Sequence, residues 1–462
     1  MIRKEDIFNK LPPEDLAVST EDIRKLANKP VIVILDDDPT GTQTVHDVLL
    51  LTKWTDSQLS RALEEPVFYL LTNSRSLGER VAYELVYSVC TRLFSLAERK
   101  GKKLLLVSRS DSTLRGHFQA ELAAMKQAAE RPDALTVFIP AFFEGGRFTV
   151  GNIHYVQEGD YLIPAGETPF AQDATFGFTH SQLYEYILEK DDSIAQHEIF
   201  DFSLEEIRTL SVDKLVEKVI THSHKKVLII NAASYTDLTK SALVLHSLYA
   251  HSYPFMIRSA ASMVPALAGI DPIPLIDYRQ DSQPLHGGLI VVGSYVPKSS
   301  AQLQYLQESN PKLEQIELGV DRLLQDRDIT FIAEMVYQLD RYLSEGKDCV
   351  FYTSRKLVSG NSPLASLRII NTVSRAVIEV VKALTISPSF IIAKGGITSS
   401  DIATKALNIE EATVMGQLLP GVPVWRPTQS ARFPDTPYVV FPGNVGTKES
   451  LHLAYQKVRS HA

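Results

Sequence analysis

Three runs of polar residues follow predicted buried strands in the first half of the sequence. The first run covers residues 36–44 and reads DDDPTGTQT. Its three consecutive carboxylates, on Asp36, Asp37 and Asp38, repel one another, and Mg²⁺, basic partners or a hydroxyl-rich ligand would offset that repulsion. The simpler alternative is a solvated turn in which aspartate side chains cap the backbone.

Arginine marks the second run, residues 72–76, which reads TNSRS. The planar guanidinium of Arg75 could bind a carboxylate through two parallel hydrogen bonds. A lone arginine after a strand is more often a surface ion pair, so Arg75 alone decides little.

The third run, residues 108–117, reads SRSDSTLRGH and is polar at nearly every position. It precedes a predicted helix, whose N-terminus attracts anions. Ser112 or Thr113 could simply cap that helix, but a cap requires neither Arg109 nor Asp111. The three runs together predict a site for a small polyhydroxy carboxylate, with arginines for its carboxylate and aspartates for its hydroxyls.

The second half of the sequence carries three glycine turns after predicted strands. They cover residues 293–295 (GSY), 394–401 (KGGITSSD) and 442–447 (PGNVGT). Glycine lets backbone N–H groups approach an anion closely, and a helix that begins at the turn adds its positive end. The second turn could instead be structural, with Thr398 capping a helix and Asp401 completing a capping box. Three such turns in one half favour a nucleotide site, to which the lysine of the second turn adds a charge.

Several widespread motifs are absent from the sequence, namely G-x-x-x-x-G-K-[ST], a G-x-G-x-x-G after a strand, H-E-x-x-H and G-x-S-x-G. These absences disfavour a P-loop NTPase, a standard dinucleotide dehydrogenase, a zincin and an α/β-hydrolase. The residues alone therefore predict an α/β enzyme that handles anions, with one half for a polar acid and the other for phosphates.

Short apolar runs alternate with amphipathic stretches, and this alternation predicts parallel sheets covered by helices on both faces. The expected strands cover residues 31–35, 67–71, 103–107, 135–139, 227–230, 288–292, 349–352 and 390–393. The expected helices include residues 79–98, 118–129, 298–307, 365–384 and 401–407.

The alternation breaks over residues 258–283, which are rich in small residues and proline. We place a domain boundary near Pro284, giving domains of residues 1–284 and 285–462. Each domain is expected to contain a mainly parallel sheet flanked by helices, with the active site in the cleft between them. Residues 144–178 are expected to form a long irregular insertion.

Bulk composition narrows the class of protein. A chain of 462 residues predicts two or three domains, and a net charge of -8 disfavours nucleic acid and anionic membranes as partners. The sequence has two cysteines, Cys90 and Cys349, which lie far apart and have no Cys or His nearby at metal-ligand spacing. They do not make a disulfide framework, which favours a reducing compartment. No signal-like apolar segment and no apolar run of about 18 residues is present. We expect a cytoplasmic protein.

The ordered set of motifs resembles the four-carbon acid sugar kinase family, in a divergent branch, over nearly the whole chain. The resemblance rests on residues 37–41 (DDPTG), 72–75 (TNSR), 111–116 (DSTLRG), 140–147 (PAFFEGGR), 293–294 (GS), 395–398 (GGIT), 421–423 (GVP) and 443–446 (GNVG). Arg109 stands where the family usually has lysine, and Ile397 where it usually has a polar residue.

The resemblance implies an N-terminal domain that binds an acid sugar and a C-terminal domain that binds ATP. The substrate-binding residues implied are Asp37, Asp38, Arg75, Arg109, Ser110, Asp111 and Ser112. The ATP-binding residues implied are Ser294, Gly395, Gly396, Ile397, Thr398, Gly443 and Asn444. The implied reaction is transfer of the γ-phosphoryl group of ATP, with Mg²⁺, to a hydroxyl of a tetronate-like acid such as threonate or erythronate.

Phosphoryl transfer depends mainly on positioning and charge neutralisation. Asp37, or in second place Asp111, is expected to accept the proton of the attacking hydroxyl. Two alternatives stay open: a metal-dependent phosphatase or aldolase acting on a sugar acid, and a non-catalytic sugar-acid sensor regulated by nucleotide. The expected partners are the sugar acid and ATP, with a homodimer as one option for assembly.

Overall fold

The computed structural model describes residues 2–277, 285–293, 296–325, 329–355, 363–443 and 445–459. The chain divides into two compact units. The first unit comprises residues 1–49 and 53–272, and the second comprises residues 50–52 and 273–462. Each unit is described separately below.

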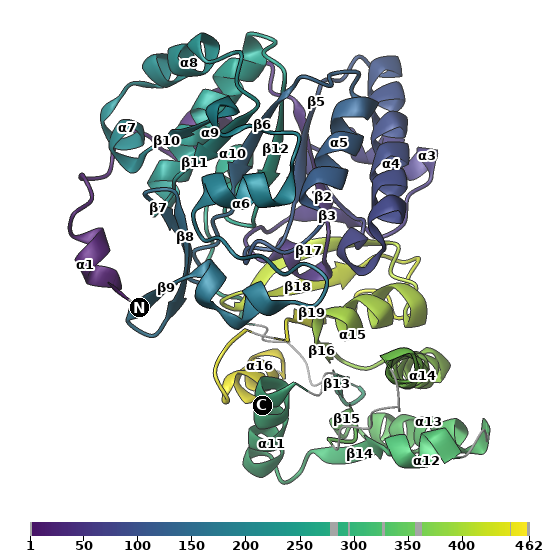
Figure 1. The fold of residues 1–462 in the computed structure, drawn as a ribbon. Helices are drawn as coiled ribbons and strands as arrows, with labels where there is room; N and C mark the ends of the chain where they lie inside the picture. The colour runs from purple at the N-terminus through teal and green to yellow at the C-terminus, as the bar shows by residue number, and fades with distance from the viewer. Residues whose placement is uncertain are drawn as a thin grey trace. The chain divides into compact units, whose positions relative to one another are not determined.

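A parallel sheet forms the centre of the first unit (Figure 1). Its strand order is β10-β11-β6-β12-β5-β2-β4. The strands are β2 (Val31–Asp36), β4 (Val67–Leu71), β5 (Leu104–Arg109), β6 (Leu135–Ile139), β10 (Ile199–Phe202), β11 (Val227–Ile230) and β12 (Phe255–Ser259). Nearly all their side chains are buried, as expected for apolar strands covered on both faces.

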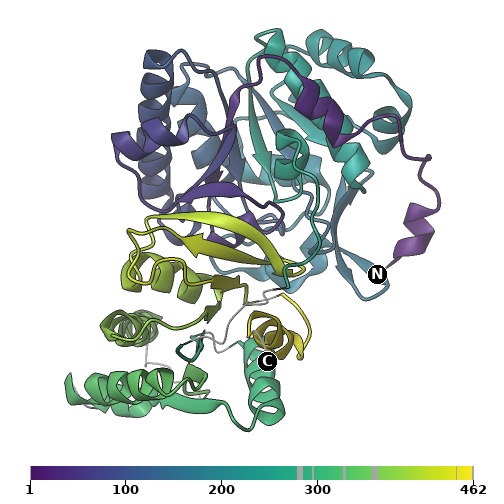
Figure 2. The same cartoon turned by 180° about the vertical axis from the view of Figure 1, so that it is seen from behind.

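Two groups of helices flank this sheet (Figures 1 and 2). One group consists of α3 (Asp56–Ala62), α4 (Glu79–Arg99) and α5 (Phe118–Ala128). The other consists of α2 (Thr20–Lys25), α7 (Leu204–Thr209), α8 (Val212–Thr221), α9 (Tyr235–Ala250) and α10 (Met263–Ala268). Helix α5 begins at Phe118 with His117 at its N-cap position, so the alternative in which Ser112 or Thr113 caps the helix does not hold.

The insertion at residues 144–178 is ordered, which corrects the expectation of an irregular segment. It contains the antiparallel strands β7 (Arg147–Val150), β8 (Ile153–Glu158) and β9 (Tyr161–Pro164), and β9 also pairs with β1 (Ile2–Arg3). Apolar side chains on one face of these strands, together with residues of α1 (Lys4–Phe8), form a small separate core. Helix α6 (Leu183–Lys190) follows the insertion.

The second unit also contains a mainly parallel sheet, with an antiparallel pair at one side. The strand order is β17-β18-β19-β16-β13-β15-β14. The strands are β13 (Leu289–Val292), β14 (Glu314–Leu318), β15 (Cys349–Thr353), β16 (Ile391–Lys394), β17 (Glu411–Leu419), β18 (Val422–Pro427) and β19 (Tyr438–Phe441). The helices are α11 (Pro297–Ser309), α12 (Val320–Gln325), α13 (Ile329–Ser344), α14 (Pro363–Ala383), α15 (Gly396–Asp401) and α16 (Ser450–Val458).

Helix α15 begins at Gly396, before the expected cap at Thr398, and continues as a π-helical turn over Ile402–Ala406. The eight strands expected from sequence are all present, with ends that agree to within two residues. The predicted fold class, two α/β domains with mainly parallel sheets flanked by helices, is therefore confirmed.

The second unit includes a short segment from near the start of the chain. Strand β3 (Val48–Leu51) neighbours β17, and residues 50–52 belong to the second unit. Thr52 donates its backbone N–H to the carbonyl of Glu410 at 3.0 Å. The predicted boundary residue, Pro284, lies outside the described residues, and the second unit resumes at Ile273.

Candidate active site

The three polar runs of the first half meet at one edge of the first sheet. Strand β2 lies between β5 and β4, and all three run parallel. Asp36 is in register with Arg109 on one side and with Leu71 on the other. The carboxyl ends of neighbouring parallel strands face the same crevice, which is where α/β sheets bind ligands. The runs are therefore brought together as the sequence predicted.

Asp36 and Arg109 form a buried ion pair at the base of this edge. An NH1 nitrogen of Arg109 lies 3.1 Å from Asp36 Oδ1 and 3.5 Å from Asp37 Oδ1. Burial raises the pKa of Asp36, and the Arg109 guanidinium beside it opposes that rise. A side chain at Gly41 would overlap the Asp36 carboxylate, so the glycine in the turn after β2 is required by this packing.

Asp37 is a buried carboxylate with no hydrogen-bond partner. Its side chain is 1% exposed, and neither oxygen forms a hydrogen bond with a described residue, although Arg109 NH1 lies 3.5 Å from Oδ1. Burial raises the pKa of Asp37 to about 6, although Arg75 and Arg109 act in the opposite direction. Gly116, at a positive φ of 122°, approaches so closely that a Cβ would lie 3.1 Å from Asp37 Oδ2. An unbonded carboxylate in this setting is suited to accept a hydroxyl or a proton.

Arg75 bridges two of the polar runs. Its guanidinium pairs with Asp38 and lies 3.3 Å from Asp111 Oδ1. Although burial acts to raise the pKa of Asp38, Arg75 and Thr40 hold it below its usual value. Both arginines predicted to bind the carboxylate of the acid thus already have partners inside the protein: Arg75 pairs with Asp38 and Arg109 with Asp36.

Asp111 is more strongly paired than Asp37. Arg115 Nε lies 2.8 Å from Asp111 Oδ2, and Thr113 donates its hydroxyl to the same oxygen. These contacts and Arg75 overcome the effect of burial and hold the pKa of Asp111 well below its usual range. Asp111 is therefore a weaker base than Asp37.

The flanking serines are fixed through their backbone groups. The N–H of Ser110 donates to the Ser259 carbonyl at 2.9 Å, and the Ser112 carbonyl lies 2.8 Å from His154 Nε2. Both serine side chains are buried.

A second buried network lies beside the site, and sequence reasoning did not assign it. Glu121 on α5 accepts hydrogen bonds from Ser74 and Ser108, which follow β4 and end β5 respectively, and pairs with Arg258 on β12. The network thus ties three strand ends to one helix. The available signal was a charged residue within an apolar pattern: Arg258 lies inside a buried strand, and Glu121 lies on the apolar face of α5.

The three glycine turns of the second half follow neighbouring parallel strands of the second unit. Strand β16 lies between β19 and β13. A side chain at Gly293 would overlap Thr398, and a Cβ at Gly443 would lie 4.0 Å from Gly395 Cα. Gly395 has a φ of 115°, which favours glycine. The turns therefore meet at one sheet edge, where the start of α15 presents backbone N–H groups without helical partners.

Lys394 points into the protein instead of toward a ligand at these turns. Its Nζ is buried and donates to the carbonyls of Pro442, at 2.6 Å, and Gly443. Burial lowers the pKa of Lys394 to about 7. Ile397, in contrast, is 71% exposed beside these turns. The predicted ATP-binding residues Ser294 and Asn444 lie outside the described residues.

Within the described ranges, no group of three or more His, Cys, Asp or Glu side chains is arranged to hold a metal ion. Across the same ranges, no helix combines the length and apolar character needed to cross a membrane.

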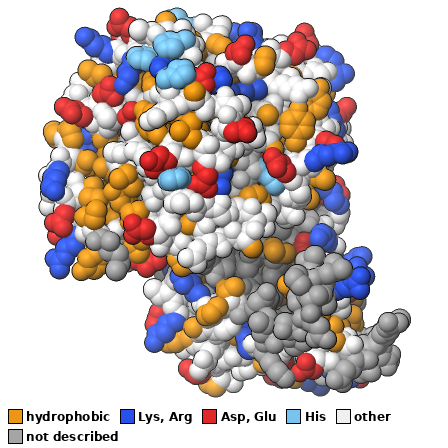
Figure 3. All heavy atoms as spheres, in the orientation of Figure 1, with side chains coloured by type: hydrophobic (Ala, Val, Ile, Leu, Met, Phe, Trp, Pro, Cys, Tyr) orange, Lys and Arg blue, Asp and Glu red, His pale blue; other side chains and the backbone are white. Residues whose placement is uncertain are grey.

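Acidic and basic side chains are interspersed on the visible face of the first unit (Figure 3).

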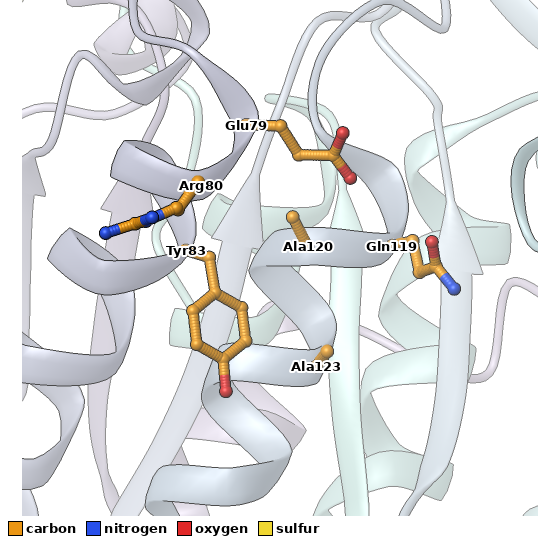
Figure 4. A pocket seen from close by; sticks show the side chains of 6 residues that line it. All are labelled: Glu79, Arg80, Tyr83, Gln119, Ala120 and Ala123. Carbon is orange, nitrogen blue, oxygen red and sulfur yellow. The ribbon is translucent and has the colours of Figure 1, made fainter.

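A pocket of about 530 Å³ lies between α4 and α5 (Figure 4). Its lining residues are Glu79, Arg80, Tyr83, Gln119, Ala120 and Ala123. None of the predicted site residues lines it, and Arg80 Nε already bonds Glu84 at 2.9 Å. The strand-end cluster therefore remains the better candidate site in the first unit.

Two family models match the chain, one in each unit. A model described as a sugar-binding N-terminal domain matches residues 32–267, and one described as a nucleotide-binding C-terminal domain matches residues 289–451. The division of chemistry between the halves agrees with these descriptions.

Two curated relatives, both named D-threonate kinase, are similar to this chain. The Salmonella typhimurium relative is 25% identical over 333 residues, covering 70% of this chain and 72% of the relative. The Bordetella bronchiseptica relative is 33% identical over 165 residues, covering 33% of this chain and 38% of the relative.

Two solved structures share the fold. A Salmonella typhimurium LT2 protein described as a tRNA synthase has a TM-score of 0.68 at 14% identity, covering 92% of this chain and 99% of that one. A Haemophilus influenzae protein has a TM-score of 0.63 at 14% identity, covering 92% of this chain and all of that one.

Proposed function

Because the chain belongs to the four-carbon acid sugar kinase family, we propose that it transfers the γ-phosphoryl group of ATP to a hydroxyl of a small sugar acid, with a tetronate such as threonate or erythronate as the first candidate. The observation that carries this proposal is Asp37, which holds two unbonded carboxylate oxygens at a strand end of the sugar-binding unit.

Asp37 is the proposed proton acceptor. Its raised pKa, about 6, lies close enough to neutral pH for it to be mainly ionised in the cell and still take up a proton in the transition state. Arg109, 3.5 Å from its Oδ1, stabilises the ionised form. Asp111 is second in rank, because its guanidinium partners make it a weaker base.

The same strand ends are proposed to surround the acid. Asp38, Arg75, Ser110 and Ser112 supply carboxylate, guanidinium and hydroxyl groups beside Asp37. Since Asp37 and Ser110 are buried, binding requires the segment at residues 110–117 to move aside and then close again. Closure excludes water, which would otherwise compete with the sugar hydroxyl for the phosphoryl group.

The glycine turns of the second unit are proposed to bind the phosphates of ATP. Gly443 leaves room for a phosphate oxygen, since an added Cβ would lie 4.0 Å from Gly395 Cα. Gly395 and Gly396 are proposed to offer backbone N–H groups, and Thr398 a hydroxyl. Ser294, Ile397 and Asn444 complete the proposed nucleotide site. Transfer requires the hydroxyl of the bound acid to reach the γ-phosphate of the bound ATP.

We propose that Mg²⁺ binds together with ATP, coordinated mainly by the phosphates, and not at a site made of protein ligands alone. The described residues offer no cluster of three ligands, and Mg²⁺ in kinases is commonly held by phosphates, water and one or two carboxylates. When bound, it would neutralise charge on the ATP phosphates.

The test is ADP release by the full chain with ATP and Mg²⁺ over a panel of tetronates, pentonates and hexonates. ADP release with one acid class supports the kinase. Turnover of a sugar acid without ATP would favour the phosphatase or aldolase. Binding of both ligands without ADP release would favour the sensor.

A further inference from the structure

Five arginines surround the strand-end cluster of the first unit, and four of them have a carboxylate partner. Those four are Arg75, Arg109, Arg115 and Arg258, paired with Asp38, Asp36, Asp111 and Glu121 respectively. The fifth is Arg147, and no carboxylate among the described residues lies within ion-pair distance of it. An arginine at a strand-end site without an internal anion is positioned to bind an external one.

The backbone fixes Arg147 in place. It is the first residue of β7, and its backbone exchanges two hydrogen bonds with Phe142 across the turn at Gly145 and Gly146. A side chain at Gly145 would crowd Phe142 and Arg147, and one at Gly146 would crowd Gln157. The two glycines therefore let the turn hold the guanidinium where it lies.

The guanidinium of Arg147 has bonding capacity left over. One of its NH groups donates to the Gly145 carbonyl, while Nε is buried and has no partner. An arginine that served packing alone would be expected to satisfy its buried N–H, because an unpaired buried donor costs about 1–3 kcal/mol. The side chain as a whole is half-buried, so part of it can still be reached.

A second guanidinium lies near that of Arg147, on Arg115, which itself pairs with Asp111 and Asp173. The guanidinium groups of Arg115 and Arg147 lie 5.2 Å and 5.8 Å from the centre of the same ring, that of Phe170. Burial lowers the pKa of Arg147, and repulsion from Arg115 acts in the same direction, while the attraction of Asp111 opposes both. Arg75 and Arg115 both pair directly with Asp111, so the negative charge of Asp111 is already balanced without Arg147.

We propose that Arg147, with Arg115 beside it and the Phe170 ring beneath both, binds the carboxylate of the sugar acid and thereby selects acids over neutral polyols. This inference rests on the proposed function and gives a role to the ordered insertion that carries Arg147 and Phe170. Arg75 and Arg109, whose charges are met internally, then position the aspartates that face the hydroxyls.

The test compares Arg147→Gln and Arg147→Lys with a matched control, Arg80→Gln, in the full chain. The Arg80 side chain is 89% exposed on α4. For each protein, kcat/KM is measured for the best aldonic acid and for the alditol of equal length, and affinity for the acid is measured by calorimetry. Melting curves and the affinity for an ATP analogue report whether each variant is folded.

Arg147→Gln is expected to lower kcat/KM for the acid on the order of 100-fold, mainly through KM, and to change it for the alditol by less than about 3-fold. Arg147→Lys is expected to retain part of the activity, because it keeps the charge without the two-pronged geometry. If Arg147→Gln does not fold, Arg147→Lys serves as the test. A loss of about 10-fold in its kcat/KM for the acid, with no loss for the alditol, would support the same role for Arg147.

Equal losses on acid and alditol, or an unchanged acid affinity in a folded variant, would overturn the assignment of Arg147. A wild-type chain that releases no ADP with any acid would instead overturn the proposed kinase, and calorimetry would still decide whether Arg147 binds the acid. A wild-type chain that binds no aldonic acid would overturn both.

Discussion

A carboxylate without hydrogen-bond partners in a protein interior costs stability, and Asp37 is such a group. Its neighbours Asp36, Asp38 and Asp111 each have at least one oxygen bonded by a guanidinium or hydroxyl group, although Oδ2 of Asp36 is unbonded among the described residues. This contrast distinguishes a residue held ready for a ligand from residues that hold the site together.

Asp37→Asn should reduce activity and raise stability at the same time. Removing the proton acceptor is expected to lower kcat by about 10²–10⁴-fold. Because the folded-state pKa of Asp37 is raised to about 6, ionisation destabilises the fold: the penalty is absent below about pH 4, grows between pH 4 and 6, and is complete above that range. The variant should therefore gain about 3 kcal/mol of unfolding free energy at pH 8 and little at pH 4.

Urea unfolding at the two pH values and an ADP-release assay make this measurement. Asp133→Asn, at an exposed position of the same unit, is the control and should change neither quantity. A stability gain for Asp37→Asn that does not depend on pH would contradict the assignment.

Gly41→Ala should destabilise the first unit, because the new Cβ would overlap the Asp36 carboxylate. Displacing Asp36 also disturbs its pair with Arg109, so we expect a loss of about 1–3 kcal/mol together with reduced activity. Gly78→Ala is the matched control, since no atom lies within 4 Å of the added Cβ. Equal unfolding midpoints for the two variants would show that the Gly41 turn is not tightly packed.

At the scale of elements, each unit uses the same device. Neighbouring parallel strands end at one edge, and the segments after them carry the chemistry: charged side chains in the first unit and glycine turns in the second. The strands that supply these segments are β2, β4 and β5 in one unit and β13, β16 and β19 in the other.

Gly443→Val should weaken ATP binding by about 10-fold or more, because a branched side chain would fill the space between the turns after β16 and β19. Gly319→Val, at the turn after β14, is the control, because among the described residues only Arg322 Cβ, at 3.8 Å, lies within 4 Å of its added Cβ. Calorimetry with a non-hydrolysable ATP analogue is the measurement. Wild-type affinity in Gly443→Val would place the phosphates elsewhere, whereas acid affinity should be unchanged in both variants.

At the scale of the whole molecule, the two units are not separable by one cut. The second unit contains residues 50–52, and Thr52 bonds Glu410 and Ile409 through its backbone and hydroxyl. A fragment of residues 273–462 would lack this segment and expose strand β17, and an unpaired strand edge promotes self-association.

We therefore expect the fragment of residues 273–462 to self-associate in size-exclusion chromatography. Adding a peptide of residues 46–54 should raise the melting temperature of the fragment. A scrambled peptide of the same composition is the control. A monomeric fragment whose melting temperature does not respond to the peptide would show that residues 50–52 contribute little to the second unit.

The sequence alone determined the strands, the parallel sheets and the convergence of the polar runs. Strand 67–71 is an example: five consecutive apolar residues can be buried on both faces only within a covered sheet, so the local pattern was sufficient. The convergence of Asp37, Arg75 and Arg109 followed from the geometry of parallel strands, which needs no knowledge of side-chain contacts.

The insertion was misjudged because its strands are short and only partly buried. Phe148, Tyr155 and Leu162 form a core with residues of α1, so the apolar partners of β7–β9 lie far away in sequence. No local pattern reveals such a partner. The placement of residues 50–52 in the second unit could not be predicted for the same reason, because their partners near residue 410 are far away in sequence.

Only the tertiary structure decided which charges are free. Arg75, Arg109 and Arg147 are the same residue type at the ends of strands: Arg75 follows β4, Arg109 ends β5 and Arg147 begins β7. Whether a guanidinium is paired depends on carboxylates that the fold brings close. Asp38 and Asp111 pair with Arg75, and Asp36 pairs with Arg109. Among the described residues, no carboxylate pairs with Arg147. Pairing at short range is a property of distances, and the sequence order does not contain them.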